Sequence, residues 1–208
     1  MITVWGGQTS RSLRVVWLLE EMGLPYRVRQ VDMLAAERDL EFLALNPADY
    51  IPAIQDGEVA MVESIAIMEY LMARYGPTPL APSPKDPAFP AYQQFLHLGE
   101  AGLATLMMPV IVSRFLAPET ERENWGAAWS LQSFQKRLKL VGQRLASSPY
   151  LAGEAFTAAD ISVTYALNLG QRNCGVTLGE TEQAHLERTT GRAAYKRAIA
   201  RSHEGVGA

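Results

Sequence analysis

Cysteine and histidine are scarce in this sequence. Its 208 residues include one cysteine and three histidines. The single cysteine, Cys174, excludes an internal disulfide and a cysteine-rich metal site, and it is more typical of a small buried residue than of a nucleophile. The histidines lack the paired spacing of a zinc site, so we expect no bound metal at His97, His185 or His203.

Excess positive charge and long apolar runs are also missing. The formal net charge is -3 and the basic residues are scattered, so we expect no nucleic-acid partner. The chain opens with Ile2-Thr3-Val4-Trp5, without the basic region and apolar core of a signal peptide, and no apolar run approaches the length of a membrane span. We therefore expect a cytoplasmic protein with no membrane partner.

The composition that remains is that of an ordinary globular protein, with 48% hydrophobic and 20% charged residues. The first 45 residues read as strand, helix, strand and a short helix. The first helix carries an apolar stripe and ends at Gly23, and Tyr26 to Val31 follows as a strand. Strand, helix and strand this close together predict a parallel pair with a crossover helix. The stripe consists of Val15, Leu18, Leu19 and Met22, and the short helix lies around Glu37 to Leu45.

The stretch from Asn46 to Gly76 predicts a β-hairpin followed by a helix. Its two short apolar runs, 53–55 and 59–62, are separated by a turn in which Gly57 takes a positive φ. The helix opens at Glu63-Ser64 and ends at Gly76-Pro77. Its predicted buried stripe consists of Ile65, Met68, Met72 and Tyr75.

Two features of this stretch allow either a structural or a binding role. Ser64 is a plain helix N-cap, or it binds a carboxylate with the free N–H groups behind it while Glu63 takes an ammonium group. Pro52 is an ordinary trans loop proline, or it is cis and leaves the backbone of Ile51 free to pair with an extended peptide.

A proline before a β-hairpin, then Glu-Ser opening a helix, resembles the second half of the thioredoxin-like domain of the glutathione transferase family. The order βαβ, α, ββα over about the first 76 residues is similar to that domain as well. The resemblance implies a cis Pro52, with the γ-glutamyl group of glutathione bound at Glu63 and Ser64. It also implies a homodimer.

The loop between the first strand and the first helix contains no cysteine, so thiol-disulfide exchange by an enzyme thiolate is excluded there. It offers the hydroxyls of Thr9, Ser10 and Ser12 around Arg11 instead. A hydroxyl that donates to the glutathione sulfur favours the thiolate, and the adjacent helix N-terminus helps. Lowering a thiol pKa by two units takes about 2.7 kcal/mol, which one charge-assisted bond and the dipole can supply.

Within the family, Thr9 falls where phi-, tau- and zeta-like members have their serine, and Ser10 falls nearer the theta-like position. The tract from Ser10 to Arg14 resembles a bacterial and fungal subgroup with an SRSxR pattern. We favour Ser10 as the thiol partner, then Thr9, with Ser12 as the helix N-cap. Arg11 is either a partner of a carboxylate or thiolate or simply solvated. The missing cysteine argues against omega- and beta-like thiol transfer and against maleylacetoacetate isomerisation.

The second half of the chain predicts an all-helical domain. Prolines cluster in a linker at 77–85, and Asp86 with Pro87 reads as a helix start. We therefore divide the chain into a thioredoxin-like domain at 1–76 and an all-α domain at 86–208. The expected helices run from 86 to about 115 with a bend near Gly102 or Pro109, over 119–146, from a capping box at Thr157 to Asp160 onward, and over 180–188 and 193–201.

These features predict a glutathione transferase that adds the glutathione thiolate to small hydrophobic electrophiles, in a detoxification role. Two alternatives stay open: a glutathione-dependent peroxidase or reductase, which would use the same thiolate, and a non-catalytic interaction module of the same fold. Apolar residues of the helical domain either line the electrophile pocket or pack in the core. They are Met107, Met108, Ile111, Phe115, Trp125 and Trp129.

Overall fold

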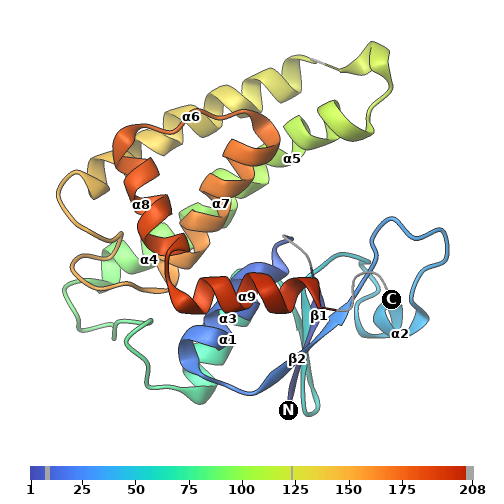
Figure 1. The fold of residues 1–208 in the computed structure, drawn as a ribbon, viewed down its shortest axis with the longest axis horizontal. Helices are drawn as coiled ribbons and strands as arrows, with labels where there is room; N and C mark the ends of the chain where they lie inside the picture. The colour runs from blue at the N-terminus through green and yellow to red at the C-terminus, as the bar shows by residue number, and fades with distance from the viewer. Residues whose placement is uncertain (8–9, 123, 205–208) are drawn as a thin grey trace. The chain divides into compact units, whose positions relative to one another are not determined.

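The computed structural model describes residues 1–7, 10–122 and 124–204. By their contacts these residues form two compact units. The first contains Met1–Thr78 together with the segment from Gly191 onward, and the second contains Pro79–Thr190. Figure 1 shows the course of the chain through its helices and strands.

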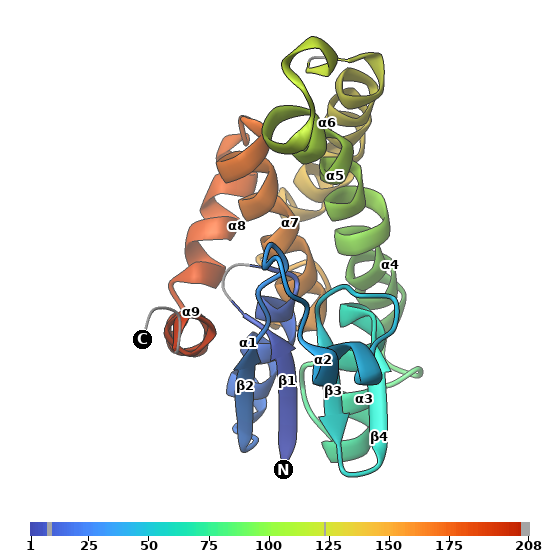
Figure 2. The ribbon, with the colours of Figure 1, turned by 90° about the vertical axis from the view of Figure 1, so that its right-hand side faces the viewer.

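The first unit is built on a four-stranded mixed sheet in the order β2-β1-β3-β4, as Figure 2 shows with the strands side by side. The β1/β2 pair is parallel, as predicted, and the other two pairs are antiparallel. With a helix after β1, after β2 and after β4, this is the predicted thioredoxin-like order. The strands are β1 (Ile2–Gly6), β2 (Tyr26–Gln30), β3 (Ala53–Asp56) and β4 (Val59–Val62).

Helix α2 (Leu40–Leu45) is shorter than the predicted helix around Glu37 to Leu45. It begins late because Asp39 caps it, accepting hydrogen bonds from two backbone N–H groups. Its buried residue, Phe42, packs on Trp5 of β1 with ring centroids 6.0 Å apart. Phe42 and Trp5 therefore lie on one face of the sheet. Val4, the neighbour of Trp5, points to the opposite face, because successive side chains of a strand alternate.

Helix α1 (Ser12–Met22) ends at Gly23, as predicted, and the φ of Gly23 is left-handed at 64°. The last helix, α9 (Ala193–His203), packs against α1. Trp17 and Tyr195 meet edge to face with ring centroids 4.8 Å apart, and Arg192 forms an ion pair with Glu21. The C-terminal helix therefore belongs to the first unit by contact, although the chain reaches it only after the second unit.

Helix α3 (Ser64–Tyr75) follows the β3/β4 hairpin, whose Gly57 has the expected positive φ, 59°. Ile65, Met68 and Met72 are buried as predicted. The prediction is wrong for Tyr75, which is 38% exposed. It lies in the last turn of α3, where its hydroxyl donates to Asp56 Oδ2 at 2.6 Å instead of packing in the core.

The second unit is helical. Its first run is continuous from Phe89 to Leu116, but the hydrogen bonding becomes π-helical across Gly102 and again after Pro109. The start predicted at Asp86 is wrong, because Asp86 accepts from the backbone N–H of Ala88 in a turn that precedes the helix. The helices are α4 (Phe89–His97), η1 (Leu98–Ala104), α5 (Thr105–Ile111), η2 (Val112–Leu116), η3 (Glu119–Glu121), α6 (Trp125–Leu145), α7 (Ala158–Cys174) and α8 (Glu180–Thr190).

The run from Phe89 to Leu116 corrects one expectation. It has 28 residues and contains an 18-residue stretch with a mean hydropathy of 1.6, so it is long and apolar enough to cross a membrane, whereas no such run was expected from the sequence. Core helices of globular proteins meet the same criterion. Here the run packs on α7. Ser162 Oγ of α7 donates to the Leu96 carbonyl at 2.7 Å, and a methyl group added to Gly99 would lie 2.3 Å from Ser162 Oγ.

Candidate functional site

The sheet register gathers the predicted site residues at one edge. Trp5 of β1 pairs with Ala53 of β3, which pairs with Val62 of β4. The segments just beyond these residues are the loop after β1, the Ile51-Pro52 step and the Glu63-Ser64 step. A methyl group added to Gly6 would lie 2.6 Å from Ser12 Cβ and 3.7 Å from Ile51 Cβ, so the loop after β1 and the Ile51-Pro52 step are in close contact.

Gly7 organises the loop that leads into α1. Its N–H donates to Ser12 Oγ at 2.8 Å, and its carbonyl accepts from Ser10 Oγ at 2.8 Å. The two serine oxygens are 2.6 Å apart. Ser10 is half-buried and Ser12 fully buried, so of these two hydroxyls Ser10 is the one that a ligand can reach. Thr9, the other predicted thiol partner, lies outside the described residues.

The predicted N-cap role of Ser12 is wrong. Ser12 is the first residue of α1, and the half-buried Arg11 occupies the cap position without a side-chain capping bond. The reason is that the Ser12 hydroxyl is directed at Gly7. The first turn of α1 contains no acidic residue, so no carboxylate there offsets the partial positive charge of the helix start.

The Ile51-Pro52 peptide bond is cis, as the resemblance implies. Ile51 itself is half-buried. Within the described part of the chain, its N–H donates no hydrogen bond to another backbone group and its C=O accepts none. Both groups are therefore available to an extended peptide laid along this edge.

The start of α3 combines an exposed carboxylate with a buried hydroxyl. Glu63 occupies the cap position with a φ of 69°, unusual for a residue other than glycine, and it forms no capping bond. Ser64 is the first helical residue and is 3% exposed, so the plain N-cap role considered for it is wrong. The first turn contains no acidic residue, which leaves an electropositive helix start.

Two residues that were not predicted from the sequence support this helix start. Arg14 is fully buried, and its Nη1 donates to Ser64 Oγ at 3.3 Å. Tyr50 donates from its hydroxyl to Glu63 Oε1 at 2.9 Å, and desolvation followed by this bond raises the Tyr50 pKa. A signal existed for Arg14, which lies four residues before Leu18 on the buried face of α1. No pattern in the sequence singles out Tyr50.

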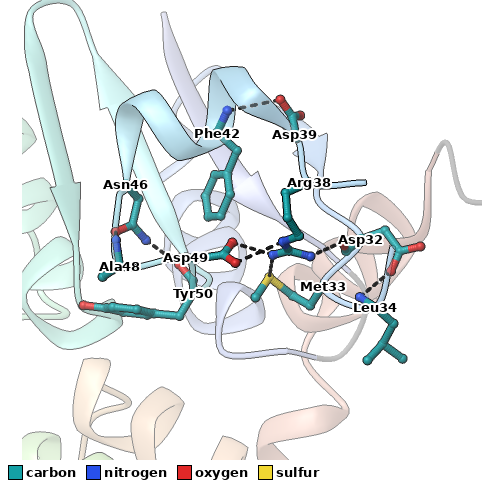
Figure 3. A network of polar contacts seen from close by, with 10 residues as sticks. All are labelled: Asp32, Met33, Leu34, Arg38, Asp39, Phe42, Asn46, Ala48, Asp49 and Tyr50. Carbon is teal, nitrogen blue, oxygen red and sulfur yellow. Dashed lines mark hydrogen bonds and ion pairs between the residues drawn. The ribbon is translucent and has the colours of Figure 1, made fainter. Parts of the chain in front are cut away.

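A polar network fixes the segment that precedes Ile51, as Figure 3 shows. Arg38 binds the Asp49 carboxylate with two of its nitrogens and donates to the Asp32 carbonyl at 2.9 Å. Asn46 donates to the Tyr50 carbonyl at 2.6 Å. The network therefore holds the Tyr50 backbone, and with it the hydroxyl that reaches Glu63.

The apolar residues considered for an electrophile pocket differ in burial, and Ile111 is half-buried. Met107 is fully buried and belongs to the core, whereas Met108, Phe115, Trp125 and Trp129 are exposed. The second unit contains a cavity of about 300 Å³ beside the start of α6, but none of the six candidates is among its lining residues. That lining consists of Val110, Ser113, Arg114, Arg122, Asn124, Ala127, Ala128 and Leu131.

Cys174 and the potential metal-ligating side chains are the remaining groups considered. Cys174 is buried in the second unit, and desolvation raises its pKa, as expected for a thiol that packs as a small apolar residue. Among residues 1–7, 10–122 and 124–204, no three side chains of histidine, cysteine, aspartate or glutamate cluster as a metal would require.

Comparison with known proteins identifies the family. The family model described as glutathione S-transferase, N-terminal domain, matches residues 1–73. Glutathione S-transferase 3 of Schizosaccharomyces pombe is 31% identical over 185 residues, covering 83% of this chain and 76% of that protein. Glutathione S-transferase GstB of Escherichia coli K12 is 28% identical, covering 78% of this chain and 80% of that protein.

Solved structures agree. The theta class glutathione S-transferase of Xanthomonas axonopodis pv. citri, determined with glutathione bound, has a TM-score of 0.80 and 28% identity, covering 95% of this chain and 96% of that one. The proline before a β-hairpin, the Glu63-Ser64 helix start and the order of strands and helices are the features of this chain that led to the same family from sequence. The chain belongs to the glutathione S-transferase family.

Proposed function

We propose that this glutathione transferase binds glutathione along the edge where β1, β3 and β4 meet and activates the thiol with the loop before α1. One observation carries the proposal. The sheet register brings the hydroxyl loop, the free Ile51 backbone and the open start of α3 to the same edge. Each segment suits a different part of an extended tripeptide.

The γ-glutamyl head group suits the start of α3. Its α-carboxylate would accept from the Ser64 hydroxyl and the first backbone N–H groups, with the Arg14 guanidinium behind them. Its ammonium would pair with the exposed Glu63 carboxylate, which Tyr50 orients. A carboxylate and an ammonium on one carbon atom match this arrangement of one cation and one anion.

The cysteinyl residue of glutathione suits the Ile51-Pro52 step. Its main chain would pair with the N–H and C=O of Ile51 as an added strand, since the described residues leave both groups unused. This pairing sets the direction of the cysteinyl side chain, because side chains alternate across a strand. The thiol would then be directed by the backbone rather than by side-chain contacts.

The thiol suits the Ser10 hydroxyl, with Thr9 and Arg11 as further candidates and Ser12 holding Gly7. A hydroxyl that donates to sulfur stabilises the thiolate, and the start of α1 adds its partial positive charge. The sulfur then bonds to an electrophilic carbon, by addition or with displacement of a leaving group, and no bond to the enzyme forms. Catalysis consists of positioning and thiolate stabilisation.

The electrophile in this proposal is small and hydrophobic, and the role is detoxification in the cytoplasm by a homodimer. Exposed apolar side chains on α5, η2 and α6 support an apolar cosubstrate, among them Met108, Phe115 and Trp125. The retained head-group site argues against a non-catalytic module, and a peroxidase would use the same thiolate. A sedimentation coefficient of a monomer at micromolar concentration would contradict the homodimer.

Calorimetric titration of glutathione tests the binding site. We expect saturable binding to the wild type and affinity at least about tenfold weaker in Ser64→Ala, as expected for one lost charge-assisted bond of about 1.5 kcal/mol. Ser147→Ala is the matched control, because Ser147 is an exposed serine in the second unit. No heat of binding at millimolar glutathione would reject the transferase function while leaving the fold assignment intact.

Steady-state kinetics of Ser10→Ala test the thiol partner. We expect kcat to fall by about 100-fold with little change in glutathione binding, because Ser10 interacts with the thiol and not with the head group. Thr9→Ala is the comparison variant. If Thr9→Ala lost turnover and Ser10→Ala kept it, the assignment would pass to Thr9.

A further inference from the structure

The side chain of Gln30 joins the C-terminal end of α9 to the sheet. Gln30 is the last residue of β2, opposite Gly6 of β1. Its Nε2 donates to the carbonyl of Ser202 at 2.9 Å and to that of Glu204 at 3.0 Å. Carbonyls at the end of a helix have no partner within the helix, so Gln30 satisfies groups that α9 cannot satisfy itself.

The other side of the same amide lies against Gly7. A methyl group added to Gly7 would be 1.7 Å from Gln30 Oε1 and 2.5 Å from its Cδ, so a side chain at this position would displace the Gln30 amide. Gly7 also has a φ of 136°, which residues with a side chain rarely adopt. The Gln30 amide therefore borders the backbone whose N–H and C=O hold Ser12 and Ser10.

The orientation of the Gln30 amide is set by α9. An amide nitrogen has two N–H donors, and the two α9 carbonyls account for both. With the nitrogen fixed on α9, the oxygen side is fixed on Gly7. The position of the Gly7 peptide thus depends on where α9 ends.

We propose that Gln30 is a positioning residue for the reaction, which couples the end of α9 to the Ser10 hydroxyl through Gly7. This inference rests on the proposed function, in which Ser10 stabilises the glutathione thiolate. Gln30 does not contact the thiol itself. Its loss lets the Gly7 peptide shift and misdirects Ser10, and a misplacement of about 1 Å in a catalytic group can cost about 100-fold in rate.

The test replaces the amide and follows the thiolate. Gln30→Met keeps the length of the side chain and removes both donors, and Gln30→Glu places a carboxylate against the two α9 carbonyls. The matched control is Gln55→Leu, because Gln55 is an exposed glutamine on strand β3. The pKa of bound glutathione is read from thiolate absorbance against pH, together with kcat, KM and the exchange rate of the Gly7 amide proton.

Both Gln30 variants are expected to raise the pKa of bound glutathione toward that of the free thiol. They should lower kcat at neutral pH by about tenfold or more and leave the KM for glutathione within about twofold. They should also speed the exchange of the Gly7 amide proton with solvent. Gln55→Leu should change none of these. An unchanged thiol pKa and unchanged Gly7 exchange in either folded Gln30 variant would overturn the inference.

A double-mutant cycle tests the contribution of α9. Tyr195→Leu weakens the packing of α9 on Trp17 and should raise the thiol pKa in the wild type. In Gln30→Met it should add little, because the coupling is already lost. Full additivity of the two changes would overturn the role of α9.

The two proposals fail differently. If wild-type protein binds glutathione without lowering its thiol pKa, the thiolate role of Ser10 fails. Gly7 exchange in the ligand-free protein then decides the inference alone: faster exchange in Gln30→Met supports the coupling, and unchanged exchange rejects it.

Discussion

Helices α3 and α7 both begin with a hydroxyl residue near a carboxylate, but their first turns are built in opposite ways. At α7, the Asp160 carboxylate accepts from the backbone N–H of Thr157 at 2.8 Å and of Leu151 at 2.9 Å. This is the predicted capping box, and Asp160 is fully buried. The protein itself satisfies these donors, and no room for a ligand remains.

At α3 no side chain caps the helix. The Glu63 carboxylate is exposed and held by Tyr50, and the Ser64 hydroxyl receives a bond from the buried Arg14. A helix start that is closed from within stabilises the fold, whereas one left open with a cation behind it favours an anion from outside. Substitutions at α7 should therefore change stability, and those at α3 should change binding.

The largest effect is expected from Asp160→Ala. It removes the acceptor for two buried N–H groups and leaves a cavity, so the free energy of unfolding should fall by about 3 to 4 kcal/mol. Urea unfolding followed by circular dichroism measures this. Asp86→Ala, at an exposed turn of the same unit, is the control and should cost less than about 1 kcal/mol. A similar loss in both variants would contradict the special role of the box.

The next prediction concerns pH and His185, a buried residue of α8 whose Nε2 lies 3.8 Å from Asp160 Oδ1. Desolvation, with the nearby Arg188, lowers the His185 pKa to about 4, so its contribution to stability is lost as pH falls from 6.5 toward 4. Desolvation raises the Asp160 pKa to about 6, so that group adds stability as pH falls from 6 toward 3.8. The two effects oppose each other.

His185→Gln removes only the first effect. Between pH 7 and pH 4 the stability of this variant should rise relative to wild type by about 3 kcal/mol, from a shift of about 2.5 pKa units. Urea midpoints at intervals across this range provide the comparison. Parallel pH profiles for the two proteins would show that His185 does not remain neutral in the folded state.

Arg14→Met tests the open helix start. Removing the cation behind Ser64 should weaken glutathione binding by about 10- to 100-fold, as expected for a charge-assisted bond to a carboxylate. Stability should change much less, because replacing a buried charge by an apolar side chain of similar length is often close to neutral. Calorimetry and urea unfolding of the same samples separate the two. Lost stability with unchanged affinity would make Arg14 structural.

Most of the first unit could be predicted from sequence because its signals are local. Asp56-Gly57 between short apolar runs gave the hairpin, and in the second unit the equally local pair of Thr157 and Asp160 gave the start of α7. The predicted burial of Tyr75 was wrong. The apolar stripe indicates one face of a helix, but it does not show that the last turn of α3 lies beside Asp56. The helix α9 was predicted, but its packing partner was not. An apolar face does not indicate which helix it packs against, and α1 is distant from α9 in the sequence.

The candidate site was predicted in part for the same reason. Ile51, Pro52, Glu63 and Ser64 lie next to recognisable turns, whereas Arg14 and Tyr50 act through contacts across long sequence separations. The sequence could not separate Ser10 from Ser12, because neighbouring hydroxyls give the same pattern. The choice between Ser10 and Thr9 stays a prediction, since Thr9 lies outside the described residues. The bond from Gly7 to Ser12 is what separates a supporting serine from an accessible one.

The smallest effect is expected from Tyr50→Phe. The change removes one hydrogen bond to the exposed Glu63 carboxylate and leaves the aromatic ring, so the KM for glutathione should rise by only about two- to fivefold with kcat unchanged. Because the bond orients the group proposed to hold the ammonium, the defect should disappear for a glutathione analogue that lacks the γ-glutamyl amino group. Tyr70→Phe, which loses a similar bond to Asp56, is the matched control. An equal defect with both cosubstrates would mean that Tyr50 supports the loop before Ile51 rather than the ammonium site.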